Sequence, residues 1–92
     1  MFEKIDDITI DYEEDGVLLV KEVDKEVLTR GAWTTIVFKY QQWENKNEAY
    51  SADKYTIRRF RKLNDEYKYQ SKFNISSKDQ ALKIIEILNK WM

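Results

Sequence analysis

Hydrophobic and polar residues alternate with a period of two along most of this chain, as they do in β-strands that bury one face. The segment 32–43 shows the strongest strand composition, because threonine, β-branched and aromatic residues dominate it. Four further segments have the pattern or the composition of strands: residues 8–12, 17–29, 55–63 and 67–75. Together they predict an antiparallel β-meander of four to five strands.

Turn signals separate these segments. Asp15-Gly16 is typical of a tight hairpin turn, and Gly31 allows the chain to reverse or bulge after Arg30. Asn64-Asp65-Glu66 predicts a three-residue hairpin loop. Residues 44–54 are polar and without periodicity, so they predict a loop near the long end for a compact domain.

The hydrophobic period changes to that of a helix near the end of the chain. Ser77 and Gln80 form a capping-box pattern, in which the side chain of each residue accepts a hydrogen bond from the backbone N–H of the other. An apolar stripe follows at helical spacing, made by Ala81, Ile84, Ile85, Leu88 and Trp91. We therefore predict a helix over residues 77–91 that folds back onto the sheet.

These elements predict one α+β domain, an antiparallel β-meander of four to five strands followed by one C-terminal helix packed on the sheet. The domain covers residues 1–92, with an acidic strand or hairpin over 1–16, the meander over 17–75 and the helix over 77–91. A domain of this size buries only about two-thirds of its unfolded surface. Such marginal domains often gain stability as oligomers, and we expect a homodimer.

The segment 32–43 is apolar on both faces. Trp33 and Val37 lie on one face, whereas Ile36, Phe38 and Tyr40 lie on the other. One helix covers two or three strands on one side of a sheet. The second face therefore needs another cover, and curling of the sheet, a second protomer and stacked bases are the three candidates.

The register of the last two strands decides which side chains are exposed. A three-residue loop would pair Ile57 with Phe73 and Tyr55 with Ile75, whereas a two-residue loop would set Ile57 opposite Lys72. Under the first register Tyr67, Tyr69, Ser71, Phe73 and Ile75 face the helix. The outer face then carries Arg58, Phe60 and Lys62 beside Lys68, Gln70 and Lys72, while Arg59 and Arg61 fall on the helix side near the hairpin tip.

Cations with an aromatic ring between them are what single-stranded nucleic acid needs, because the cations bind phosphates and the rings stack on bases. We expect Arg58, Lys62, Lys68 and Lys72 to contact phosphates. Phe60 is the expected stacking ring, with Tyr40 or Trp43 as additional platforms, and Gln70 completes the predicted site. An ordinary solvated sheet face with one stray ring is the alternative interpretation.

Charge is divided unevenly along the chain. Residues 1–26 hold ten acids and three lysines, a net charge of −7, whereas residues 27–92 hold thirteen bases and seven acids, a net charge of +6. This polarity could steer an anionic partner, or it could hold two protomers together. A solvated hairpin that faces another part of the same fold explains it equally well.

Several function classes have no support in the sequence. The chain has neither cysteine nor histidine, so it lacks a disulfide framework and the usual nucleophile–base pairs. No glycine-rich phosphate loop occurs, and the carboxylates around Asp15 lack the spacing of a calcium loop. We expect no enzyme activity, cofactor, metal or small-molecule substrate. The chain also lacks a signal-peptide pattern and an apolar run of about 20 residues, so we expect a cytoplasmic protein without membrane contact.

Two stretches carry a resemblance to a known group. Lys72-Phe73-Asn74-Ile75-Ser76-Ser77-Lys78-Asp79-Gln80 runs into Ala81-Leu82, and Lys54-Tyr55-Thr56-Ile57-Arg58-Arg59-Phe60 is a basic strand. Over roughly residues 17–92 the chain resembles the PC4/Whirly/PUR-type single-stranded nucleic-acid-binding superfamily. The resemblance implies a dimer, formed through the helix, that binds unpaired DNA or RNA on curved sheets. The acidic N-terminal segment and the lack of glycine-rich turns depart from that group.

Two functions remain open. The first is a dimeric module that binds single-stranded DNA or RNA with little sequence preference, as an accessory protein of transcription or nucleic-acid metabolism. The second is a protein-interaction or assembly domain without nucleic-acid binding. Its acidic N-terminal segment would dock on a basic surface, and Trp33 and Trp43 could serve as interface anchors as readily as platforms for bases.

Overall fold

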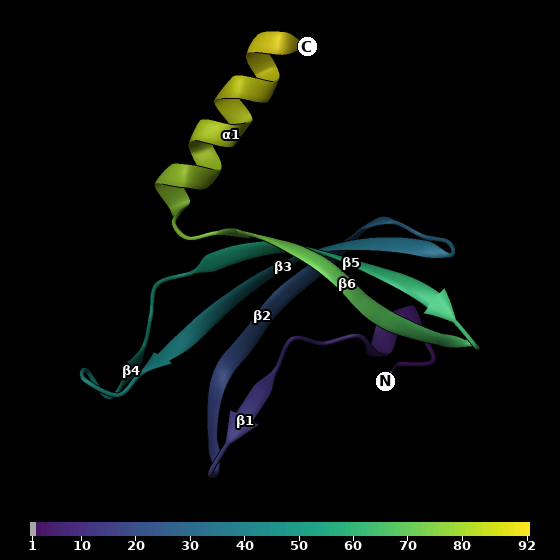
Figure 1. The fold of residues 1–92 in the computed structure, drawn as a ribbon. Helices are drawn as coiled ribbons and strands as arrows, with labels where there is room; N and C mark the ends of the chain where they lie inside the picture. Colours follow the sequence, from purple (N-terminus) through teal and green to yellow (C-terminus); the bar gives the residue numbers. More distant parts are fainter. Residues whose placement is uncertain (1) are drawn as a thin grey trace.

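The computed structural model describes residues 2–92 as a curled antiparallel sheet followed by one C-terminal helix (Figure 1). The strands follow the order β1-β2-β3-β5-β6, and β4 pairs with the end of β3. The α+β meander predicted from the sequence is confirmed. The elements are η1 (Ile5–Asp7), β1 (Tyr12–Glu14), β2 (Val17–Thr29), β3 (Trp33–Glu44), β4 (Ala49–Tyr50), β5 (Lys54–Leu63), β6 (Glu66–Ile75) and α1 (Lys78–Trp91).

The predicted limits of the four long strands are confirmed to within one residue at each end. The Asp15-Gly16 turn is also confirmed, and both residues have positive φ, as a tight hairpin turn requires. The predicted loop 44–54 contains the short strand β4, which pairs Tyr50 with Trp43. The prediction of a strand over residues 8–12 is wrong, since only Tyr12–Glu14 pairs with β2 and residues 5–7 form a 3₁₀ turn.

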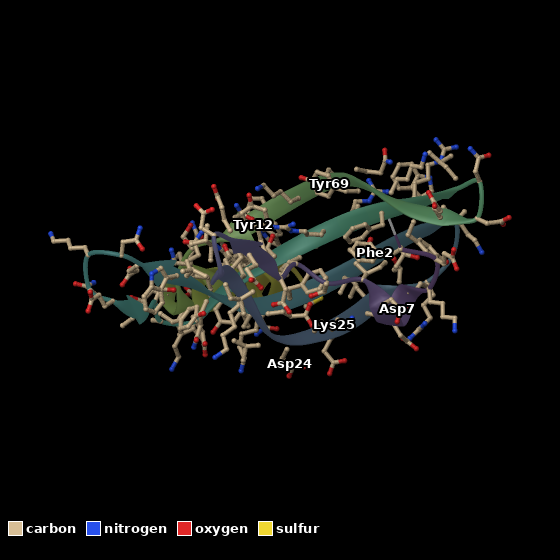
Figure 2. The ribbon with its side chains drawn as sticks, turned by 90° about the horizontal axis from the view of Figure 1, so that it is seen from below. Phe2, Asp7, Tyr12, Asp24, Lys25 and Tyr69 are labelled. Carbon is tan, nitrogen blue, oxygen red and sulfur yellow. The ribbon has the colours of Figure 1, made fainter. Side chains whose placement is uncertain are left out.

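The N-terminal segment instead crosses the concave face of the sheet (Figure 2). Ile8 and Ile10 are buried there, in one cluster with Ile36, Phe38, Tyr40, Phe60 and Tyr67. At one end of the segment the backbone N–H of Tyr67 donates to the carbonyl of Phe2 at 2.7 Å. Farther along, the Lys25 ammonium donates to the carbonyls of Asp6 and Ile8 at 2.8 and 2.6 Å. The acidic segment therefore docks on its own chain and covers one face of the sheet.

The β5–β6 hairpin differs from the prediction in its turn. The loop has two residues, Asn64 and Asp65, which have φ values of 52° and 64°. A bulge at residue 70 of β6 then restores the predicted register, with Ile57 opposite Phe73 and Tyr55 opposite Ile75. As a result, the β6 side chains that point to each side of the sheet change from odd-numbered to even-numbered residues, or the reverse, at the bulge.

The exchange places tyrosines and apolar residues of β6 on opposite sides. Tyr67 and Tyr69 share the concave side with Phe60, whereas Phe73 and Ile75 share the convex side with Ile57. The expectation that residues 67, 69, 71, 73 and 75 lie on one face is therefore wrong. Because an extra residue in one strand inverts the alternation after it, periodicity alone cannot show the change.

The predicted helix cap is confirmed, except that the Gln80 side chain bonds the backbone N–H of Ser76 in place of that of Ser77. Ser77 Oγ accepts a hydrogen bond from the Gln80 backbone N–H at 3.1 Å, and Gln80 Oε1 accepts one from the Ser76 N–H at 2.8 Å. From this cap α1 rises on the side of the sheet opposite the N-terminal segment (Figure 1). Only its first turns stay close to the sheet, and none of its residues is buried. A straight helix can touch a convex surface over a short length only.

Candidate nucleic-acid interface

Two of the predicted stacking rings are unavailable at the surface. Phe60 is 3% exposed and Tyr40 is 6% exposed, because the N-terminal segment covers both. The expectation that Phe60 lies in the open among cations is wrong. The sequence pattern could not reveal this, since the cover comes from a segment distant in the chain.

The remaining predicted residues lie in four places. Arg58, Lys62 and Lys72 lie on the concave side of the β5–β6 hairpin, whereas Lys68 lies opposite Arg61 on the convex side. Gln70 is the bulged residue and is exposed. Trp43 lies at the far end of β3, where its ring meets Tyr50 edge-on at 5.2 Å and its indole N–H donates to Asn45. The structure therefore does not bring Trp43 to the predicted site.

A group of four residues on the convex side has the chemistry that the sequence led us to expect elsewhere. Trp33 pairs with Arg61 across β3 and β5, and Arg61 pairs with Lys68 across β5 and β6. The guanidinium carbons of Arg59 and Arg61 lie 4.5 and 5.3 Å from the centre of the Trp33 ring. Trp33 remains 42% exposed. We call Trp33, Arg59, Arg61 and Lys68 the convex cluster.

A second group lies on the other side of the same hairpin. Tyr69 is 51% exposed, meets Phe60 edge-on at 6.2 Å and has the Arg58 guanidinium 5.9 Å from its ring centre. Lys72 lies directly opposite Arg58 on the neighbouring strand, and Lys62 lies over the Tyr67 ring. We call Arg58, Lys62, Tyr69 and Lys72 the rim cluster. Tyr69 lies at the β6 edge of the sheet, across from Asp24 on β2 (Figure 2).

The two clusters hold positive charge without a compensating carboxylate. Within residues 2–92 the ion pairs are Arg30–Asp6 at 3.9 Å and Lys83–Glu86 at 3.5 Å, and neither involves β5 or β6. Moreover, Arg58 faces Lys72 and Arg61 faces Lys68 as direct cross-strand neighbours. Like charges in such positions destabilise a sheet. An anion bound between them would relieve this repulsion.

Sequence reasoning did not place Trp33 beside the arginines, and it did not include Tyr69 among the candidate site residues. It placed Arg59 and Arg61 correctly, on the helix side towards the hairpin tip. The missing step was the ladder between β3 and β5, which sets Trp33 opposite Arg61 and could have been predicted from alternation with the right strand pairing. Tyr69 was assigned to the helix side because the bulge was not foreseen.

Among the described residues, no group of three or more acidic, histidine or cysteine side chains is arranged to hold a metal ion. Over the same residues, no helix has the length and apolar character needed to cross a membrane. Comparison of the chain with protein-family models, with curated proteins and with solved structures gave no match.

Proposed function

We propose that this protein binds single-stranded nucleic acid at the β5–β6 hairpin and acts in the cytoplasm as an accessory protein of transcription or nucleic-acid metabolism. The observation that carries the proposal is the convex cluster, where two arginines without carboxylate partners lie against an exposed tryptophan. Flat rings and guanidinium planes are the surfaces on which unpaired bases stack.

In this proposal the cations of both clusters contact phosphates and the exposed rings contact bases. Arg59, Arg61 and Lys68 serve the convex side, and Arg58, Lys62 and Lys72 serve the rim. A base stacks on the Trp33 ring or on one of the arginine guanidinium groups that lie against this ring. Tyr69 offers a second ring. Because the base faces of a duplex are stacked internally, this arrangement favours unpaired strands.

Stacking on Trp33 is tested by intrinsic fluorescence. The chain has three tryptophans, Trp33, Trp43 and Trp91, so each can be replaced by phenylalanine in turn. We expect oligo(dT) to quench the emission of wild-type protein, Trp43→Phe and Trp91→Phe, and to leave the emission of Trp33→Phe nearly unchanged. We expect Trp33→Ala to weaken binding by about 1–3 kcal/mol, the value of one stacked base.

The outcome that contradicts this assignment is quenching of the Trp33→Phe emission by oligo(dT) to the same extent as the wild-type emission. The base would then lie near Trp43 or Trp91, away from the convex cluster. Since the phenylalanine of the Trp33→Phe variant keeps a ring for the arginines, the variant tests the position of the base and leaves the cation–π arrangement largely in place.

An assembly domain without nucleic-acid binding is the second candidate. One observation favours it, namely the exposed apolar stripe of α1, which includes Trp91 at 75% exposure. In that case the two clusters are solvated surface, and oligo(dT) changes the emission of no variant.

A further inference from the structure

The helix α1 lacks the packing that a helix of its length needs. It has 14 residues, and isolated helices shorter than about 12–15 residues are marginal in water. Its apolar stripe and the adjoining Leu82 are nonetheless largely open to solvent, with Leu82, Ile85, Leu88 and Trp91 at 51%, 53%, 47% and 75% exposure and Ile84 half-buried. A stripe of this kind is normally buried, because most helix stability in proteins comes from an apolar face that packs.

The convex face of the sheet is likewise uncovered next to the helix. An open groove of about 390 Å³ lies between the first turns of α1 and the sheet, lined mainly by Val37, Tyr55, Ile75, Ala81, Ile84 and Ile85. Phe73, on the same side of β6, is 58% exposed. The groove uses only the first half of the stripe, whereas Leu88 and Trp91 lie beyond it.

The whole chain exposes more surface than a compact monomer of its mass. Its accessible surface is 6849 Å², whereas an 11.2 kDa monomer is expected to expose about 5,700 Å². Its radius of gyration is 14.8 Å against about 12 Å for a compact domain of this length, and its smallest extent is 17 Å. The excess, about 1,100 Å², exceeds the roughly 800 Å² that each partner buries in a standard interface.

We propose that a second copy of this chain covers this surface, with two protomers packed through their convex faces about a two-fold axis. The outer half of α1 of each protomer, with Leu88 and Trp91, lies in the groove of the other. Each chain supplies an apolar helix stripe whose outer half packs against nothing, and an open apolar groove that could receive it. A two-fold arrangement satisfies both at once because its interface is self-complementary.

This dimer leaves the convex cluster free. The cluster lies at the end of the sheet near the β5–β6 turn, since Trp33 pairs with Arg61, whereas the groove lies where β6 runs into α1. The groove lining reaches Val37, which pairs with Ile57, whereas Trp33 and Arg61 lie four residues farther towards the β5–β6 turn. The proposal rests on the exposed area and the groove, and it does not require nucleic-acid binding.

The first test is the mass of the full chain in solution, measured by light scattering after size-exclusion chromatography. Wild-type protein is expected at twice 11.2 kDa, and Leu88→Asp/Trp91→Asp at 11.2 kDa. Both residues are exposed in the protomer, so the variant keeps its own core, which circular dichroism and urea unfolding check. Tyr12→Asp/Val17→Asp, two exposed apolar residues of the β1–β2 hairpin, is the matched control and is expected to stay dimeric.

The second test identifies which surfaces meet. Because the natural chain has no cysteine, Val37→Cys and Leu88→Cys can be made separately, mixed and oxidised. A disulfide between the two different variants is expected, since helix and groove come from different chains. A wild-type mass of 11.2 kDa, a dimer that survives Leu88→Asp/Trp91→Asp, or a mixture without the mixed disulfide would each overturn the proposal.

Discussion

Reversing the charge of Arg59 and Arg61 together is expected to weaken single-strand binding by more than about 100-fold at low salt. Hydrogen bonds to charged groups contribute about 1.5–3 kcal/mol each, so the loss of two amounts to about 3 kcal/mol or more. The reversal also places two negative charges beside Lys68 and repels the phosphates. Fluorescence anisotropy of a labelled single-stranded oligonucleotide with Arg59→Glu/Arg61→Glu measures the change.

A matched variant separates this local effect from net charge. Lys21→Glu/Lys46→Glu alters the net charge by the same amount, but these exposed lysines lie at the far end of β2 and in the loop after β3. We expect its affinity to stay within a few-fold of wild type. Arg58→Glu/Lys72→Glu reports on the rim cluster in the same assay. Wild-type affinity in Arg59→Glu/Arg61→Glu would refute the role of the convex cluster.

The second large effect concerns the cover of the concave face. Ile8 is 0% exposed and packs in the core from the N-terminal segment. Ile8→Ala is expected to lower the free energy of unfolding by about 2–5 kcal/mol, because it removes most of a buried side chain and leaves a cavity. Since small domains have a total stability of about 5–15 kcal/mol, the loss should be plain in urea unfolding.

Leu28→Ala is the control for this substitution. Leu28 lies at a bulge of β2 and is 64% exposed, so its truncation should cost no more than about 0.5 kcal/mol. Equal urea midpoints for Ile8→Ala and wild type would show that the N-terminal segment does not seal the core. The result would then leave Phe60 and Tyr40 open to ligands, as the sequence pattern first predicted.

The features that could be predicted from the sequence are those with a local cause. Alternation and β-branched composition predicted β3, and the Ser77–Gln80 pair predicted the start of α1, because both depend on residues a few positions apart. The register that pairs Ile57 with Phe73 was predicted from the match of apolar side chains. The turn beside it was not, since a two-residue turn with a bulge gives the same register as a three-residue loop.

The site itself depended on contacts that no local pattern encodes. Residues 8–12 alternate like a strand, yet the alternation serves to place Ile8 and Ile10 against a face made by β3, β5 and β6. That contact buried Phe60 and left Trp33 and Tyr69 as the exposed rings among the cations. The cationic hairpin was therefore predictable, whereas its exposed rings depended on long-range packing.

The most direct test of the account is the salt dependence of single-strand binding by the wild-type protein, with duplex as competitor. Six phosphate contacts predict a slope of about −4.2 when the logarithm of the affinity is plotted against the logarithm of the salt concentration, so affinity should fall about 300-fold between about 50 and 200 mM salt. Duplex at equal nucleotide concentration should displace little of the labelled strand. No binding at the lowest salt, or displacement by duplex as effective as by single strand, would contradict the proposed function.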